Sequence, residues 1–406
     1  MAEAPHQGRV GRAYALALFA LCVRGVSSGS DAPSRRTDLA TSAELASYIS
    51  GLSGLSDELL LDDERPGRLL GGLADRTGGL VRKWQRTLTS LIPAPSPDIG
   101  WTLRELPPPR ANATAAFYAA LLAVQSNVHA AVLDAKYVYV LVPGLLAHFS
   151  PGYFRQSVER LRSLGLDARY LALDGSPGAC SRKNAAWLRL ALRNAHRGSG
   201  GRKLVIVAHS KGVLDTLLAL ALYPELAPTV RAVVALQAPF GGAAVADDIS
   251  ARGDDVRELL GRLLQRFDLG INSVRDMTYA ERREILRAHG CGYDPRALGG
   301  PSSVRVLSLA SRAPRRPTYA LALSHRYVLR KHRAESDGLV CVADALLPGS
   351  LAVVMDEADH GLPVLPGLPG ARLRGADVVE AAITVALTAE AELPLEAWDE
   401  AIARAL

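Results

Sequence analysis

Ser210 stands in a setting that favours nucleophilic chemistry. It is the middle residue of Ala208-His-Ser-Lys-Gly212, which separates a β-rich apolar run at 203–208 from a helical pattern at 213–223. A serine in such a strand–turn–helix adopts a strained backbone that aims its Oγ above the sheet, and the residues two before and two after it must be small. Gly212 meets that requirement, and Ala208 replaces the usual glycine with another small side chain. A serine that merely caps the helix is the alternative.

A serine nucleophile needs a general base and an acid that orients it, and both candidates follow Ser210 along the chain. Asp337 lies on the loop Glu335-Ser-Asp-Gly338, ahead of a strand-like run at 339–342, and His360 lies on a later loop. Where a parallel sheet carries such a serine, the acid and then the histidine follow it in this order. A carboxylate on Nδ1 fixes the tautomer of the ring and stabilises the imidazolium. We therefore expect these side chains to converge at one rim of the sheet, although each alone could be an ordinary loop residue.

Other acids and a second histidine lie near these positions. Asp356, Glu357 and Asp359 are rival partners for the base, but they adjoin it in sequence and are not placed across the sheet. His209 adjoins the serine, so its side chain points elsewhere on the turn. We interpret His209 as a packing residue rather than as the base.

A tetrahedral intermediate needs two amide donors for its oxyanion. The N–H group of Lys211 directly follows the serine at a helix start, where the partial positive charge favours an anion. The second donor is expected in the turn after an earlier strand, Pro143-Gly-Leu-Leu146. Leu145 is the predicted donor and Leu146 its alternative, since a Pro-Gly turn can also simply end a strand.

The carboxyl two-thirds of the chain alternate between strand and helix patterns. Apolar, β-rich runs predict strands at 137–142, 168–173, 203–208, 230–236, 304–309 and 351–354. Helical spacing predicts helices at 153–164, 184–195, 213–223 and 375–392. This alternation predicts a mostly parallel, doubly wound α/β sheet with helices on both faces. Sites in such sheets form at the carboxyl ends of the strands.

The amino-terminal third shows no chemistry. Residues 1–30 have the layout of a targeting segment, either a secretory signal or a plastid or other organellar transit peptide; a segment with no targeting role is the third alternative, so the compartment stays open. Their apolar run at 13–23 has 11 residues, too few to span a bilayer. Residues 31–134 are expected to form a helical, partly disordered lead-in with a helix at 115–132. The main domain is then expected at 135–406.

An insertion at 247–300 is expected to cap the site. Within it, apolar residues at helical spacing predict an amphipathic helix at 256–267, which is either a mobile lid or a static cap. Basic side chains gather at 312–316 and 326–333. They allow peripheral contact with an anionic membrane surface, although a solvated face explains them equally well.

Composition excludes several other classes of protein. The 406 residues are 49% hydrophobic and 22% charged, which permits a sizeable core. Four cysteines without a C-x-x-C pair argue against a disulfide scaffold and a structural zinc site. The net charge of +6 is scattered, without a basic stripe interleaved with aromatics, so no nucleic-acid partner is expected. No cofactor or metal is implied; calcium at the acidic residues before His360 is a minor alternative.

The motifs together resemble the α/β-hydrolase superfamily, and more closely a group of lipase-like plant and algal hydrolases. The resemblance covers about 137–387. The stretches that carry it are 142–145, 209–215, 237–242, 276–282, 336–340, 344–350 and 359–360. The Ser-Asp-Gly-Leu-Val loop paired with Asp-His also resembles bacterial triacylglycerol lipases. Ala208 departs from the pattern, in which glycine is usual.

The resemblance implies an α/β-hydrolase fold with a helical cap and a serine hydrolase acting on carboxylic esters. The expected catalytic residues are Ser210, Asp337 and His360, with an oxyanion hole at Leu145 and Lys211. A lipid or another small acyl ester is the expected substrate, of unspecified chain length and head group. Two alternatives are an acyltransferase that uses the same acyl-enzyme and a non-catalytic binding protein on the same scaffold.

Overall fold

The computed structural model describes residues 95–145, 147, 152–171, 181–251, 271–294, 304–314, 319–366 and 373–388. From Ser96 onward these residues belong to one compact unit. The predicted targeting segment, most of the predicted lead-in and the predicted helix at 256–267 lie outside the described residues.

The described strands form a seven-stranded sheet in the order β1-β7-β6-β5-β4-β2-β3, and every pairing is parallel. The strands are β1 (Ala111–Asn112), β2 (Tyr137–Val142), β3 (Asp167–Tyr170), β4 (Lys203–His209), β5 (Val230–Leu236), β6 (Arg305–Ser311) and β7 (Leu351–Met355). The predicted doubly wound parallel sheet is therefore confirmed. The short strand β1 was not predicted and pairs with β7.

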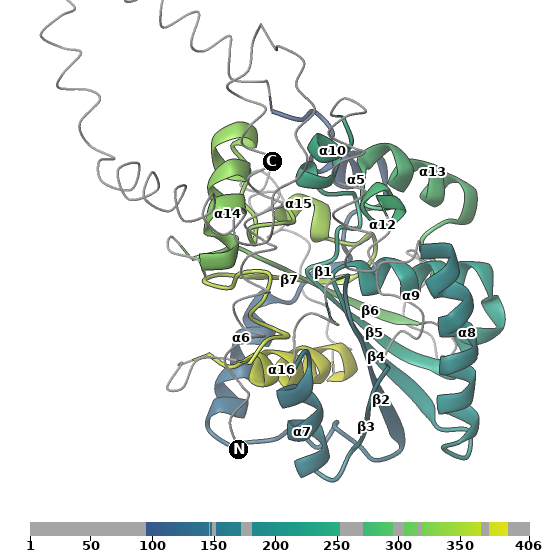
Figure 1. Ribbon diagram of the computed structural model, residues 1–406. Coiled ribbons are helices and arrows are strands. Elements are labelled where there is room, and N and C mark those ends of the chain that lie inside the picture. The colour runs from purple at the N-terminus through teal and green to yellow at the C-terminus, as the bar shows by residue number, and fades with distance from the viewer. Residues whose placement is uncertain are drawn as a thin grey trace, which may run out of the picture. The chain divides into compact units, whose positions relative to one another are not determined.

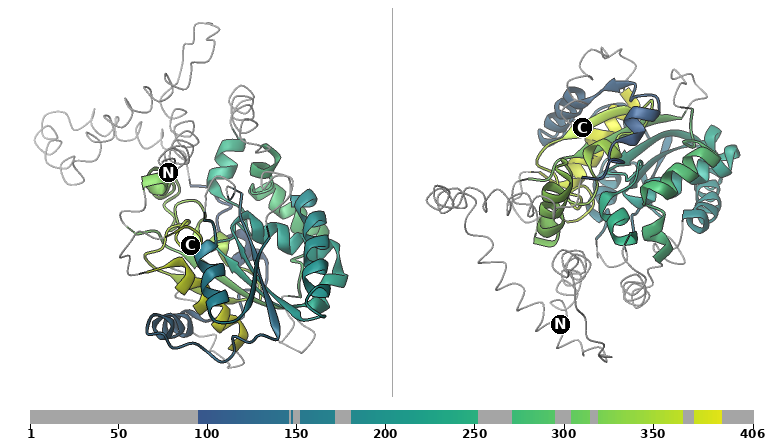
Figure 2. Two further views of the ribbon diagram at one scale, coloured as in Figure 1. Left: turned by 60° about the horizontal axis from the view of Figure 1, so that its bottom comes forward. Right: turned by 90° about the horizontal axis from the view of Figure 1, so that it is seen from above.

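Helices cover both faces of this sheet. They are α5 (Trp101–Glu105), α6 (Thr114–Gln125), α7 (Arg155–Ser163), α8 (Ser181–Arg197), α9 (Lys211–Leu222), the 3-10 helix η3 (Pro224–Thr229), α10 (Ala244–Ser250), α12 (Ile271–Arg275), α13 (Tyr279–His289), α14 (Tyr319–His332), α15 (Val342–Ala345) and α16 (Gly375–Thr388). Helices α6, α7 and α16 lie on one side of the sheet, and α8 and α9 on the other (Figure 1). The view from above shows the same two layers, with α16 in yellow and α8 in teal (Figure 2). Helices α10, α12, α13 and α14, which follow β5 and β6 in the chain, lie above the sheet in Figure 1.

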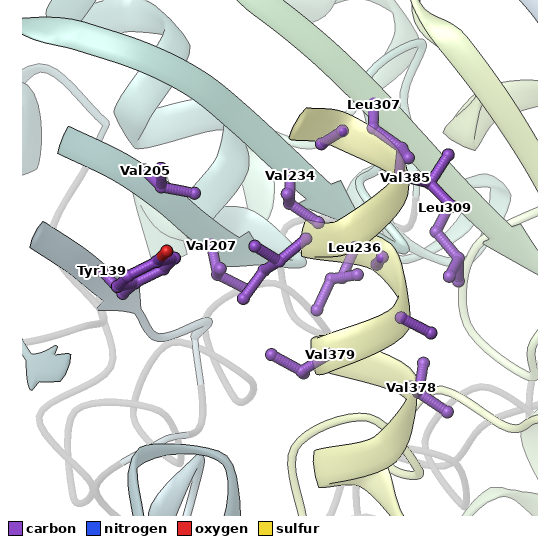
Figure 3. Close-up of a cluster of buried hydrophobic side chains, with 14 of the residues drawn as sticks. Tyr139, Val205, Val207, Val234, Leu236, Leu307, Leu309, Val378, Val379 and Val385 are labelled. Carbon is purple, nitrogen blue, oxygen red and sulfur yellow. The ribbon is translucent and has the colours of Figure 1, made fainter. Parts of the chain in front are cut away.

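The core explains why the strand runs are continuously apolar. On β2, Tyr139 and Leu141 face α16, whereas Val138 and Val140 face α8 and α9. Figure 3 shows Val205, Val207 and other sheet residues turned toward α16. Burial of each branched side chain contributes about 1.5–3 kcal/mol. Burial on both faces thereby fixes where the carboxyl ends of the strands lie.

Two predicted elements differ from the structure. Helix α6 ends at Gln125 rather than near 132, because Asn127 adopts a left-handed φ of 57° and the N–H of Val128 turns back to the carbonyl of Ala123. The strand-like run at 339–342 is not a strand. There, Asp337 Oδ1 accepts two backbone N–H groups of the following residues, which curls the chain into the start of α15.

A buried carboxyl joins three segments above the sheet. Asp344 is 0% exposed. Its Oδ1 accepts the N–H of Gly100 at 2.8 Å, and its Oδ2 accepts the hydroxyl of Tyr279 at 2.9 Å. Burial raises the pKa of Asp344 to about 7, although these two hydrogen bonds lower it. The folded protein therefore holds the neutral acid at a pH where the unfolded chain would ionise it.

We predict that Asp344→Asn removes a pH-dependent part of the stability. Because the folded pKa lies above the unfolded value, the contribution of this group is complete below about pH 4 and is lost as the pH rises through about 7. Asparagine mimics the neutral acid, so the variant should match wild type at about pH 3.5, below both pKa values. At pH 8.5 its free energy of unfolding should be higher, by up to about 4 kcal/mol. Urea unfolding at both pH values measures this, and parallel pH profiles for the two proteins would contradict it.

Candidate active site

The candidate site lies where the winding of the sheet reverses. Strand β3 pairs with one edge of β2, whereas β5 pairs with the far edge of β4, so the connections leave β2 and β4 in opposite directions. Strands β2 and β4 are neighbours, with Val142 paired to Ala208 at their carboxyl ends. Such a switch point leaves a crevice in which open α/β sheets bind ligands. The turns at 143–145 and 209–212 border it.

Ser210 connects β4 to α9 through a strained backbone. Its φ of 54° and ψ of −130° lie in a region that non-glycine residues rarely adopt. The conformation is held because the N–H of Ser210 donates to the carbonyl of Leu236 on β5 at 2.9 Å, while α9 begins at the next residue. The reversal of the chain within one residue lifts the serine side chain out of the sheet.

Three side chains from distant parts of the chain form one chain of hydrogen bonds. Ser210 Oγ lies 2.9 Å from His360 Nε2, and His360 Nδ1 lies 2.7 Å from Asp337 Oδ2. An ionised carboxyl group can only accept, so Nδ1 carries the ring proton and Nε2 is free to accept from the serine hydroxyl. This arrangement can take a proton from the serine and return it to another atom.

Backbone contacts hold the carboxyl group of Asp337 in place in addition to its contact with His360. Asp337 is 1% exposed, and its second oxygen accepts the N–H groups of Leu339 at 2.9 Å and Val340 at 2.8 Å. Gly338 makes the turn with a φ of 103°. The backbone also joins the two loops, because the N–H of His360 donates to the carbonyl of Asp337 at 2.9 Å. The orientation of the imidazole ring is therefore set by side-chain and backbone contacts together.

Two of the three rival acids have other partners, and the third is exposed. Asp356 forms an ion pair with Arg312 at 2.9 Å, and Glu357 is exposed. Asp359 Oδ1 accepts the two backbone N–H groups that follow the histidine. Across the described residues, no group of three or more His, Cys, Asp or Glu side chains is arranged to hold a metal ion.

Two glycines allow the turns of the site to touch. A Cβ atom on Gly212 would lie 2.3 Å from the carbonyl oxygen of Pro143, and one on Gly144 would lie 3.0 Å from Cβ of Ser210. The turn after β2 and the turn after β4 therefore pack backbone against backbone. Ala208, where glycine was expected, is fully buried and fits the contact between β2 and β4.

The predicted oxyanion donors lie on these two turns. Lys211 begins α9, so its N–H is one of the helix-end amides that have no partner within the helix. Gly144 already donates its N–H to the hydroxyl of Tyr153 at 3.1 Å. Leu145, the predicted donor, is the next residue and is partly exposed. Its predicted alternative, Leu146, lies outside the described residues.

The side chain of Lys211 belongs to a buried cluster of charged and polar groups. Its Nζ lies 2.8 Å from Asp215 Oδ1, both side chains being 1% exposed, and 4.0 Å from Asp276 Oδ2. Asn184 donates to Asp215 at 2.7 Å, and the N–H of Ser181 donates to Asp276 at 2.6 Å. Burial raises the pKa of Asp276. The cluster ties the first residue of α9 to α8 and to the segment after α12.

Tyr153 and Gln237 were not predicted as site residues. The Tyr153 hydroxyl contacts Gly144 and His209, and Gln237 contacts His209 from the end of β5. Gln237 directly follows a predicted strand, which is a usable signal, whereas nothing in the sequence around Tyr153 points to the site. His209, interpreted above as a packing residue, lies between Tyr153 and Gln237. It also forms hydrogen bonds with both of these side chains and with the carbonyl of His360.

Solved structures are similar to this chain at low sequence identity. No family model matches the chain. No curated protein sequence matches it either. A metagenomic carboxyl esterase is similar at a TM-score of 0.56 and 21% identity, over 74% of this chain and 98% of that one. A Bacillus licheniformis lipase in mature form has a TM-score of 0.45 and 21% identity, over 62% and 89%. Lipase 1 from Pelosinus fermentans has a TM-score of 0.40 and 14% identity, over 56% and 93%.

The first of these likenesses, together with the parallel sheet and its flanking helices, shows that the chain has the α/β-hydrolase fold. At this level of identity the likeness concerns the fold, and the chemistry of the site rests on the side chains described above.

We predict that Gly212→Ala disrupts the site. The added Cβ would overlap the backbone of Pro143, which a side-chain rotation cannot relieve. The two turns must separate, so the variant should lose about 1–3 kcal/mol of stability and also the geometry around Ser210. Thermal unfolding and reaction with a serine-directed probe measure both. Gly198→Ala, after α8, is the control and should cost less, since its Cβ would meet one backbone oxygen at 3.0 Å, against 2.3 Å at Gly212, and lies outside the turns of the site. Equal behaviour of the two variants would contradict the prediction.

We predict that Lys211→Met is strongly destabilising. It removes the cation that pairs with the buried carboxyl group of Asp215 at 2.8 Å, and removal of one partner of a buried pair typically costs about 3–5 kcal/mol. The double variant Lys211→Met/Asp215→Asn should recover part of that loss, because the uncompensated charge is removed as well. Urea unfolding compares the free energies of unfolding. A loss below about 1 kcal/mol for the single variant would mean that the pair is not a significant anchor.

Proposed function

We propose that the protein is a serine hydrolase that cleaves carboxylic esters, with Ser210 as nucleophile, His360 as general base and Asp337 as the acid that orients the base. One observation carries the proposal: the unbroken chain of hydrogen bonds from Ser210 Oγ through His360 to Asp337, at 2.9 and 2.7 Å. The strained backbone of Ser210 supports it, since such strain concentrates at functional sites.

The chemistry follows from the positions of the atoms. Ser210 Oγ attacks the carbonyl carbon of the ester while His360 Nε2 takes its proton. Asp337 stabilises the imidazolium that forms. The oxygen of the tetrahedral intermediate receives hydrogen bonds from the N–H groups of Leu145 and Lys211, each typically worth about 3–4 kcal/mol in the transition state. His360 then protonates the leaving alcohol, and a water molecule attacks the acyl-enzyme by the same path.

The substrate is proposed to be a lipid or another small acyl ester. The similar solved structures are a carboxyl esterase and lipases, and the motifs at 336–340 and 359–360 resemble lipase-like hydrolases of plants and algae and bacterial triacylglycerol lipases. Contact with a membrane surface through the basic residues at 326–333 belongs to this proposal. In the part of the chain that the structure describes, no helix has the length and apolar character needed to cross a bilayer.

The hydrolase domain is proposed to span 135–406, with 247–300 inserted between β5 and β6 as its cap. Helices α12 and α13 lie within this insertion, and α10 runs into its start. The preceding region contributes β1 to the edge of the same sheet, and α6 packs against α16. The helix at 256–267, as a mobile lid or a static cap, stays a prediction.

Labelling by a fluorophosphonate tests the nucleophile directly. The probe reacts with a serine that has an adjacent base, so wild type should gain one adduct, mapped to the peptide that contains Ser210. Ser210→Ala should not be labelled and should lose hydrolysis of p-nitrophenyl esters by at least about a thousandfold. Ser163→Ala, an exposed serine at the end of α7, is the control and should keep both properties. Equal labelling of Ser210→Ala and wild type would remove Ser210 from the mechanism.

A further inference from the structure

The ring of His209 lies buried directly behind the proposed nucleophile and hydrogen-bonds on both edges. Its Nδ1 is 2.5 Å from the hydroxyl of Tyr153. Its Nε2 is 3.0 Å from the backbone carbonyl of His360 and 3.0 Å from Gln237 Oε1. The ring is 2% exposed, and its centroid is 4.6 Å from that of His360. A residue next to the nucleophile thus contacts the loop that carries the base.

Only one placement of protons satisfies these contacts. Gln237 Nε2 donates to the carbonyl of Asp359 at 3.0 Å, so Oε1 is the atom turned toward His209. Since this oxygen and the carbonyl of His360 can only accept, His209 must donate from Nε2. Burial lowers the pKa of His209 well below its usual range, so the ring is neutral and its Nδ1 accepts from Tyr153.

The hydroxyl of Tyr153 completes the connection. It donates to His209 and accepts the N–H of Gly144 at 3.1 Å. Burial raises the pKa of Tyr153, so it keeps the proton that it donates. Gly144 precedes Leu145, the proposed oxyanion donor. The next residue after the tyrosine is tied to the base loop as well, because the N–H of Phe154 donates to the carbonyl of Val364 at 2.8 Å.

We propose that Tyr153, His209 and Gln237 form a positioning relay that holds the turn at 143–145 and the loop at 359–360 in register with Ser210. This inference rests on the proposed function, because the position of these two loops matters for a reaction only if Ser210 and His360 are catalytic. These residues are positioning residues and do not contact the substrate. Their loss affects the transition state, in which the distance from the Leu145 N–H to the oxyanion decides the rate.

The test compares two buried tyrosines. Tyr153→Phe removes the hydroxyl of the relay. Tyr139→Phe removes a hydroxyl that likewise accepts one backbone N–H, at 2.9 Å, and donates to a carbonyl, at 3.1 Å, both of Asp134 before β2. We expect Tyr153→Phe to lower kcat for p-nitrophenyl ester hydrolysis by about tenfold to a hundredfold with KM within about twofold of wild type. The Tyr139→Phe control should lose a similar amount of thermal stability and keep kcat within about twofold. Equal kcat values for the two variants would overturn the relay.

Amide hydrogen exchange separates this proposal from the proposed function. Tyr153→Phe should speed exchange of the Gly144 N–H by at least about tenfold, since its acceptor is removed, whereas Tyr139→Phe should leave it unchanged. If wild type neither cleaves esters nor reacts with a fluorophosphonate, the proposed function fails, and faster exchange at Gly144 still supports the relay as a structural link. Unchanged exchange at Gly144 in Tyr153→Phe would overturn the link itself.

Discussion

The left-handed backbone of Ser210 is the constraint on which the site depends. A non-glycine residue at a φ of 54° stores roughly 1–3 kcal/mol of strain, which persists only if the surroundings leave no other conformation. Strands β4 and β5 supply that constraint from below, because they are buried on both faces and bond to each other along their length. Gly144 and Gly212 supply it from above, because any larger residue would separate the turns. The stability of the sheet thereby holds one hydroxyl in place.

The buried charges near the site have oppositely charged or hydrogen-bonding partners. The carboxyl group of Asp337 meets two backbone N–H groups as well as the imidazole of His360. The ammonium group of Lys211, the residue after the serine, pairs with Asp215 on the next turn of α9 at 2.8 Å. A buried charge without such partners would cost several kcal/mol. The polar groups near Ser210 are therefore held in position by the same contacts that make their burial affordable.

The sequence predicts the sheet well because its signal is local. Continuous apolar runs and their alternation with helical patterns give β2 to β7 and the helices α7, α8, α9 and α16. The order of Ser210, Asp337 and His360 predicts side chains that the structure brings into hydrogen-bond contact. Their catalytic role, and that of the amides at 145 and 211, stays a prediction.

What the sequence does not predict depends on contacts between distant residues. The strand β1 has two residues and exists only because β7 offers it an edge. Tyr153 belongs to the site through a hydroxyl that reaches Gly144 and His209, and no spacing rule encodes that reach. The same holds for the approach of Asp276 to Lys211, which depends on how the cap segment folds back over α9.

A crystal structure of the protein after reaction with a fluorophosphonate tests the central claim most directly. The account predicts phosphorus bonded to Ser210 Oγ, with the phosphoryl oxygen within about 3 Å of the N–H groups of both Leu145 and Lys211. Phosphorus bonded to another residue, or a phosphoryl oxygen that points away from both amides, would contradict it.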